Sequence, residues 1–144
     1  MTDIQFPAVL DADLVGYFDA EVGAGGGYVW DAVLEYRVWL YPDEGAADEC
    51  DGSDYYRPFA SYGDAFEFYK STDGAQEPIA LVLQREYIDE NEEGEFEHVA
   101  EPRLTEWPVE FLSRPKRTPN TIPDFFSPNA PANRLDILRG KAAS

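Results

Sequence analysis

The stretch from Tyr28 to Tyr41, YVWDAVLEYRVWLY, decides the fold of this chain. Apolar side chains occupy alternate positions along it, while Asp31, Glu35 and Arg37 fall on the opposite face among further apolar residues. Period-two alternation rich in aromatic and β-branched residues is typical of a half-buried β-strand. Helical spacing would instead scatter the large apolar residues around a cylinder. We therefore expect one long strand here, with its polar face toward solvent.

Two helices are expected around this strand. Asp11 is a suitable N-cap for a helix over about residues 12–22, and Gly23 would end it. The apolar stripe of this helix would consist of Leu10, Leu14, Tyr17 and Phe18. Ser61 begins a capping-box pattern, which predicts a second helix over about residues 62–72.

A β-hairpin is predicted after Pro78. Residues 79–83 are apolar on both faces and indicate a central strand, which continues outward to about residue 88. The turn DENEEGE at 89–95 leads into a shorter strand at 96–100. A further short strand is expected at 104–112, broken at Pro108, and a proline inside a strand is tolerated at a sheet edge.

The C-terminal residues differ in composition from the rest of the chain. Five prolines between Pro115 and Pro131 favour an extended, partly polyproline conformation. A short helix is expected over Asn133–Arg139, ended by Gly140. We therefore expect a single-domain α+β fold: a mostly antiparallel sheet of three to five strands with two helices. An acidic body at residues 1–113 would precede a proline-rich, mildly basic arm at 114–144.

Composition narrows the class of protein. With 144 residues and 44% hydrophobic side chains, the chain is long and apolar enough to bury a core. No apolar run reaches the length of a membrane span, and the acidic N-terminus does not resemble a secretory signal. Cys50 is the single cysteine, so no internal disulfide is possible. These features favour a cytoplasmic location.

Charge gives the main functional expectation. The net charge is −18, and residues 1–101 alone hold 25 acidic and 4 basic side chains, or −21. Such a surface repels nucleic acid and anionic membranes and attracts basic proteins. We therefore expect a basic protein partner and no direct nucleic-acid or membrane contact, and a homodimer stays open. The carboxylates expected to contact the partner are Asp43, Glu44, Asp48, Glu49, Asp51, Asp54, Asp89, Glu90, Glu92, Glu93 and Glu95.

The turn at 89–95 matches part of a calcium-binding loop. Asp89, Asn91, Glu93 and Gly94 occupy the first, third, fifth and sixth positions of the EF-hand pattern. The twelfth position, which must supply a bidentate carboxylate, is Ala100, and the flanking residues indicate strands instead of helices. We therefore assign no metal ligand, although a hard cation among the dense carboxylates is an alternative.

Catalytic residues are not indicated. His98 is the one histidine, and Glu97, Glu86 or Glu90 would lie near enough to orient it as a general base. A lone strand histidine with acidic neighbours is more often a surface residue. Cys50 stands among negative charges, which disfavour the thiolate that a nucleophile requires. We assign no catalytic or cofactor-binding residue and favour a non-enzymatic binding, adaptor or inhibitor protein.

The arm offers two interpretations. In PNTIPDFF, the apolar residues Ile122, Phe125 and Phe126 have the spacing of sliding-clamp binding peptides, but Pro119 replaces the initial glutamine of that motif. As a docking arm, these three residues would bind a partner. In the alternative that we favour, they bind the body of the same chain.

Four segments together resemble a known group of sequences: CDGSDYYRPF at 50–59, ALVLQREYIDE at 80–90, EWPVEFLSRP at 106–115 and IPDFFSPNAPANRLDILRG at 122–140. They are similar to small, mainly alphaproteobacterial proteins labelled as GCN5-family acetyltransferases. The resemblance implies acetyl-CoA-dependent acetyl transfer, which is the enzymatic alternative. That superfamily binds pyrophosphate with an Arg/Gln-x-x-Gly-x-Gly/Ala loop before a helix. This chain lacks the pattern, so no catalytic residue is transferred to it.

Overall fold

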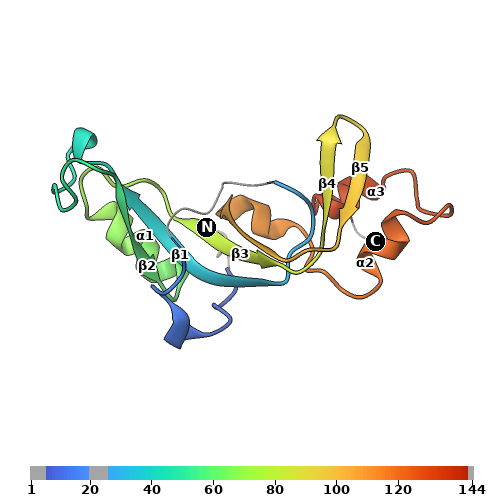
Figure 1. Cartoon of the computed structure of the whole chain (residues 1–144), viewed down its shortest axis with the longest axis horizontal. Coiled ribbons are helices and arrows are strands. Elements are labelled where there is room, and N and C mark those ends of the chain that lie inside the picture. Colours follow the sequence, from blue (N-terminus) through green and yellow to red (C-terminus); the bar gives the residue numbers. More distant parts are fainter. Residues whose placement is uncertain (1–5, 20–25, 143–144) are drawn as a thin grey trace. The chain divides into compact units, whose positions relative to one another are not determined.

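The computed structural model in Figure 1 describes residues 6–19 and 26–142 and confirms the expected α+β class. The described residues form two sheets, one of four strands in the order β2-β1-β3-β6 and one of the two strands β4 and β5. The elements are η1 (Ala12–Leu14), β1 (Ala32–Leu40), η2 (Pro42–Glu44), β2 (Tyr55–Phe59), α1 (Tyr62–Lys70), β3 (Ile79–Gln84), β4 (Tyr87–Glu92), β5 (Glu95–Val99), β6 (Arg103–Pro108), η3 (Val109–Ser113), α2 (Thr121–Phe125) and α3 (Arg134–Leu138), where η marks a 3-10 helix.

The chain divides into two compact units. The first contains described residues 6–19 and 33–81, and the second contains 26–32 and 82–142. The C-terminal arm expected at 114–144 therefore belongs, over its described residues, to the second unit. Among the described residues, no helix combines the length and the apolar character needed to cross a membrane.

In the first unit, strand β1 pairs antiparallel with β2, so that Tyr36 lies opposite Phe59 and Leu40 opposite Tyr55. Helix α1 follows β2, and the ring of Phe68 lies 5.3 Å from that of Phe59. The prediction of this helix is confirmed, since Ser61 Oγ accepts a hydrogen bond from the backbone N–H of Asp64 at 3.2 Å, although the helix ends at Lys70.

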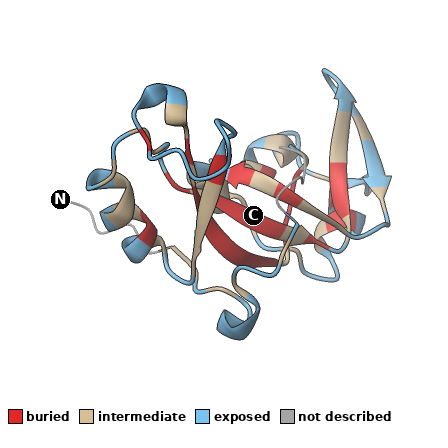
Figure 2. Ribbon diagram, turned by 60° about the vertical axis from the view of Figure 1, so that its left-hand side comes forward, coloured by how far each residue is buried: buried red, intermediate tan, exposed pale blue. Residues whose placement is uncertain are grey.

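The main correction concerns the face of the central strand that was expected to face solvent, because this face is buried. Seven of the nine residues of β1 in succession are buried, and Glu35 and Arg37 are 0% exposed. Figure 2 shows buried residues in red along the strands of the four-stranded sheet. The cause is residues 6–19, here called the cover segment, which lie against β1. Leu10 N–H donates to Val33 O at 2.8 Å, and Gly16 N–H donates to Glu35 Oε1 at 2.8 Å.

The buried charges on β1 satisfy each other. Arg37 Nε donates to Glu35 Oε2 at 2.7 Å, because residues two apart on a strand project from the same face. The same guanidinium donates through Nη2 to Asp19 O at 2.6 Å and lies 4.3 Å from the ring centroid of Tyr56. Every hydrogen bond of this cluster to the cover segment replaces one that water would otherwise make.

The prediction of a helix over residues 12–22 is wrong for the part of that stretch that the structure describes. Asp11 does cap a helical turn, because its Oδ1 accepts from Asp13 N–H at 3.0 Å, but only the 3-10 turn η1 forms. Gly16 adopts φ +91°, which ends any helix, and its N–H is used by Glu35. Leu14 and Tyr17 are therefore exposed instead of forming a buried stripe. Residues 20–23 of this prediction lie outside the described residues.

In the second unit, β4 and β5 form a hairpin as predicted, with Ile88 opposite His98, but the turn expected over residues 89–95 is shorter, because residues 89–92 belong to β4 and Glu95 to β5. The continuous strand expected over residues 79–88 is interrupted, because Arg85 donates its backbone N–H to Asp31 Oδ2 at 2.6 Å instead of to a neighbouring strand. Strand β6 lies at the edge of its sheet, as predicted, but it ends at Pro108, and the rest of the strand expected over residues 104–112 forms the 3-10 helix η3.

The arm is not extended. It forms the two short helices α2 and α3, of which α3 matches its prediction and is followed by Gly140 at φ +73°. Helix α2 tolerates Pro123 because the N–H groups of the first helical turn have no partner within the helix. One cluster of buried hydrophobic residues in the second unit consists of Tyr28, Val29, Tyr87, Ile88, Ile122, Phe125 and Leu138.

The buried ion pair on β1 generates a stability prediction. Glu35→Gln and Arg37→Met each leave one buried charge without its partner, which costs about 3–5 kcal/mol of unfolding free energy. The double variant Glu35→Leu/Arg37→Met removes both charges and is expected to lose less than either single variant. Urea unfolding of the four proteins measures this difference. Losses below about 1 kcal/mol in both single variants would contradict the buried arrangement.

Candidate functional site

The first candidate site is residues 41–54 of the first unit, here called the acidic loop. Its six carboxylates are all exposed, at Asp43, Glu44, Asp48, Glu49, Asp51 and Asp54. Two backbone contacts hold the start of the loop: Tyr41 N–H donates to Gly74 O at 2.9 Å, and Ala46 N–H donates to Tyr41 O at 3.2 Å. Gly74 is required there, because a Cβ on it would lie 2.3 Å from Ala46 N. The loop is thus fixed at its base while its carboxylates face solvent.

Most of these carboxylates have no cationic partner among the residues that the structure describes. Among the residues that the structure describes, Glu49 is the one member of the six in an ion pair, with Arg57. Asp48 accepts from Gly52 N–H at 2.7 Å, which closes a local turn. Tyr55 OH donates to Ala47 O at 2.6 Å, and burial together with the negative charge of Glu49 raises the pKa of the Tyr55 hydroxyl.

The second candidate site is residues 89–95 of the β4–β5 hairpin, here called the hairpin tip. Glu92, Glu93 and Glu95 are exposed, while Asp89 and Glu90 are half-buried. Figure 2 shows the exposed end of this hairpin in pale blue. The ladder shifts register between Glu90 and Glu92, so the tip is irregular.

Glu90 differs from the other carboxylates of the hairpin tip, because it bonds within the second unit. It accepts from Gly94 N–H at 2.9 Å and from Tyr28 OH at 3.0 Å. The Gly94 N–H lowers the pKa of the Glu90 carboxyl, and the Tyr28 hydroxyl adds to this effect against a contribution of burial that raises it. Glu90 therefore stabilises the turn and is less available to a partner than its neighbours.

Metal binding is not supported at either acidic segment. Within residues 6–19 and 26–142, no three His, Cys, Asp or Glu side chains come together closely enough to hold an ion. Asn91, which matched a calcium-loop position in the sequence, donates through its side chain to Glu97 at 2.9 Å. Asp89 and Asn91 lie in strand β4, and only Glu93 and Gly94 form the turn, so the residues that matched the calcium-loop pattern fold as part of a β-hairpin.

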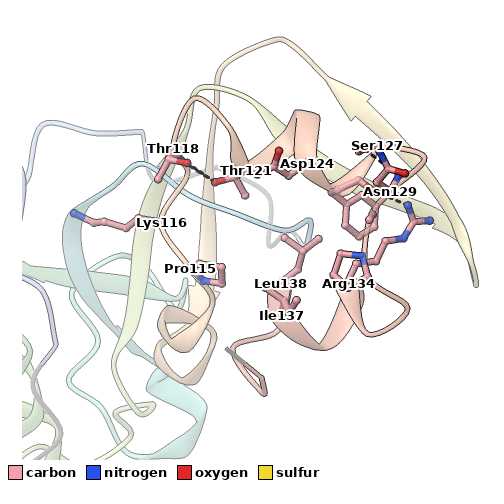
Figure 3. Close-up of a pocket in the computed structure, with 13 residues that line it drawn as sticks. Pro115, Lys116, Thr118, Thr121, Asp124, Ser127, Asn129, Arg134, Ile137 and Leu138 are labelled. Atoms are coloured by element: carbon pink, nitrogen blue, oxygen red, sulfur yellow. Dashed lines mark hydrogen bonds between the residues drawn. The ribbon is translucent and has the colours of Figure 1, made fainter. Parts of the chain in front are cut away.

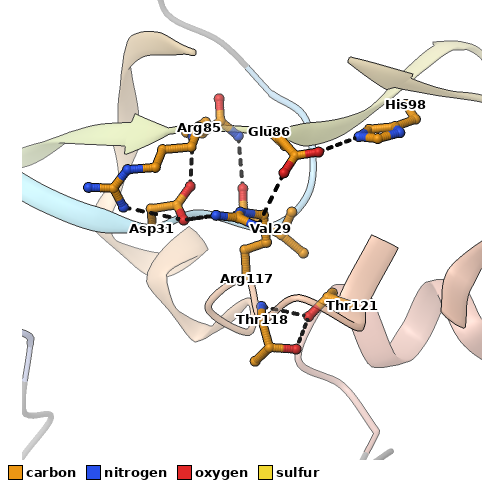
Figure 4. Close-up of polar contacts among 9 residues, drawn as sticks. Val29, Asp31, Arg85, Glu86, His98, Arg117, Thr118 and Thr121 are labelled. Carbon is orange, nitrogen blue, oxygen red and sulfur yellow. Dashed lines mark hydrogen bonds and ion pairs between the residues drawn. The ribbon is translucent and has the colours of Figure 1, made fainter. Parts of the chain in front are cut away.

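The one histidine belongs to a chain of charged residues shown in Figure 4. His98 Nε2 lies 2.8 Å from Glu86 Oε1, so Glu86 is the neighbour that orients it. Arg117 contacts Glu86 at 3.4 Å and Asp31 at 2.9 Å, and Arg85 contacts Asp31 at 3.6 Å. The side chains of His98 and Glu86 are 41% and 37% exposed, and neither lines the pocket described below. We therefore interpret this network of charged residues as structural, because it holds Arg117 and its neighbours in place.

A pocket lies in the second unit and was not predicted from the sequence (Figure 3). Its volume is about 560 Å³. The residues around it come from the segment before α2, from α2, from the α2–α3 connection and from α3. They are Pro115, Lys116, Thr118, Thr121, Asp124, Phe125, Ser127, Asn129, Ala130, Pro131, Arg134, Ile137 and Leu138. Sequence reasoning missed the pocket because it treated this stretch as extended.

The proposed docking residues of the arm are placed unequally. Ile122 and Phe125 are 4% and 3% exposed in the core of the second unit, and the ring of Phe125 lies 5.0 Å from that of Phe96. Phe126 is 41% exposed. The packing of Ile122 and Phe125 corresponds to the intramolecular interpretation, and only Phe126 presents a large apolar surface to a partner.

Comparisons with protein-family models, with curated proteins and with solved structures found no match for this chain. Function therefore has to be argued from the acidic loop, the hairpin tip and the pocket.

The contacts of Glu90 generate a pH prediction. Its folded pKa lies below the ordinary 4.5, so the stability contributed by its carboxylate is present above about pH 4.5 and is lost as pH falls through the folded pKa. In Tyr28→Phe, which removes one donor and keeps the ring, we expect the pKa of Glu90 to rise toward 4.5. Carbon-detected NMR titration of the carboxyl group measures it. An unchanged titration in Tyr28→Phe would show that the hydroxyl does not contact Glu90 in solution.

Proposed function

We propose that this chain is an acidic binding protein that acts on a basic partner protein through the acidic loop, with the hairpin tip as a second acidic surface. It acts by association and not by catalysis. The observation that supports this proposal best is the difference between the partners of the basic side chains and those of the acidic side chains. Several arginine side chains are bonded inside the fold, whereas most carboxylates of the acidic loop are left for solvent or a partner.

The arginines illustrate this use. Four of them donate to neutral backbone carbonyl groups, and the pairs are Arg37 with Asp19, Arg103 with Gly26, Arg114 with Gly27 and Arg134 with Phe125. Arg117 pairs with Asp31, whose side chain is 5% exposed and outside both acidic segments. A cation that bonds to a backbone carbonyl or to a buried carboxylate does not neutralise the acidic surface. The negative potential of that surface therefore persists.

A stable interface also needs apolar anchors, because exposed ion pairs alone contribute little. The first unit offers them on the cover segment: Leu10, Leu14 and Tyr17 are 58%, 46% and 83% exposed. Asp11 and Asp13 stand between them and are exposed as well. This alternation of acidic and apolar side chains suits a partner surface on which basic residues surround an apolar groove.

Charge neutralisation tests the acidic loop. In a triple variant of Glu44→Gln, Asp51→Asn and Asp54→Asn, three carboxylates without an ion pair lose their charge. Exposed charges contribute up to about 1 kcal/mol each, so we expect roughly tenfold weaker binding to the partner at low ionic strength. Affinity capture washed with rising salt supplies the partner, and calorimetry of the purified pair supplies the Kd.

The matched control neutralises three exposed carboxylates elsewhere in the first unit: Asp64→Asn, Glu67→Gln and Glu77→Gln. It changes the net charge equally and leaves the acidic loop intact. We expect its Kd to stay within about twofold of the wild-type value at the same ionic strength. Equal losses in the two triple variants would mean that only total charge matters, and no loss in either would exclude an electrostatic interface on this unit.

A further inference from the structure

We propose that the pocket between α2 and α3 binds a small amphiphilic carboxylate, a molecule with an apolar body and a single carboxylate group. This inference goes beyond the proposed function and does not rest on it, since the pocket lies wholly in the second unit. Its volume of about 560 Å³ falls in the range of roughly 300–1,000 Å³ that is usual for small-molecule sites.

The pocket contains a cation although the chain as a whole has a net charge of −18. Its charged lining residues are Lys116, Arg134 and Asp124, and Figure 3 shows the ammonium of Lys116 directed away from the other lining residues, so Arg134 is the cation available to a ligand. Cations that line a concave surface concentrate anions there, because the low-dielectric walls focus the field. An anionic ligand is therefore favoured at this place, although the rest of the surface repels anions.

Arg134 is held in position before any ligand arrives. Its Nη1 donates to Phe125 O at 2.6 Å, and its guanidinium lies 4.2 Å from the ring centroid of Phe125. These contacts use one donor and one face, so further N–H groups remain for a ligand. A fixed guanidinium loses little freedom on binding and matches the planar geometry of a carboxylate. Lys116 is exposed, and its ammonium lies 5.1 Å from the ring of Trp30.

The opposite wall is also fixed. Arg117 N–H donates to Trp30 O at 2.7 Å, and its side chain contacts Asp31, as Figure 4 shows. Because these bonds hold Arg117, they also hold the backbone of its sequence neighbours Lys116 and Thr118, which line the pocket. Thr118 and Thr121 share a hydrogen bond between their hydroxyl groups at 2.9 Å, visible in Figure 3. Contacts within the chain therefore hold both walls of the pocket, which reduces the ordering that binding would require.

The remaining lining residues define the ligand class. Pro115, Phe125, Ile137 and Leu138 provide apolar surface for the body of the ligand. Asp124 is a lining carboxylate and would repel a second negative charge. A phosphate dianion would meet this repulsion and leave the apolar surface uncovered. A monocarboxylate with an alkyl or aromatic body satisfies both conditions.

The test uses octanoate as the probe on the full chain, observed by ¹H–¹⁵N NMR. We expect saturable shifts at the amides of Thr121 and Ile137. Octylammonium, which reverses the charge, and inorganic phosphate, which lacks the apolar body, are expected to leave these amides unchanged. In Arg134→Met the dissociation constant should rise by about tenfold, because the carboxylate loses its charged contact, whereas Lys116→Gln, whose ammonium points away from the pocket, should change it by less than about twofold.

Two further variants keep the result interpretable. Lys70→Gln makes the same charge change in the first unit and should leave octanoate binding unchanged. Ile137→Phe fills the pocket without altering charge and should abolish binding, so the test does not depend on the folding of Arg134→Met. No saturable shift with octanoate, equal binding of octylammonium, shifts produced by phosphate instead, or unaltered binding in Arg134→Met and Ile137→Phe would each overturn the proposal.

Discussion

The contact between Glu35 and Arg37 on β1 is the constraint on which the first unit depends. Both side chains are fully buried, so each needs the other and also needs the backbone groups of Gly16 and Asp19. A buried charge without partners costs several kcal/mol. The cover segment must therefore stay on β1 once the strand forms, and its own backbone cannot complete the helix that its sequence favours. The same placement leaves Leu14 and Tyr17 on the surface.

Strand alternation, caps and turns were readable from the sequence because they are local. The Ser61 cap, the β4–β5 hairpin, the edge position of Pro108 and the helix before Gly140 all follow from neighbouring residues. What covers each face of a strand is not local. Alternation placed Glu35 on the polar face of β1, but only the cover segment, some twenty residues away, determines that this face is buried.

In the candidate sites, too, the local features were predictable from the sequence and the non-local ones were not. Exposure of the acidic loop was predictable, because six carboxylates in twelve residues cannot be buried without as many cations. The pocket was not predictable, since it requires α2 to form despite Pro123 and α3 to fold back beside it. In the structure Arg134 is bonded to Phe125 O beside the pocket.

The central claim is that the carboxylates left free by this use of the arginines are the surface that a basic partner contacts. Amide hydrogen exchange of the chain, alone and saturated with its captured partner, tests it most directly. We expect slower amide exchange over residues 41–54 in the complex, with exchange in the core of β1 unchanged. Binding that slows exchange elsewhere and leaves the acidic loop as it was would contradict the claim.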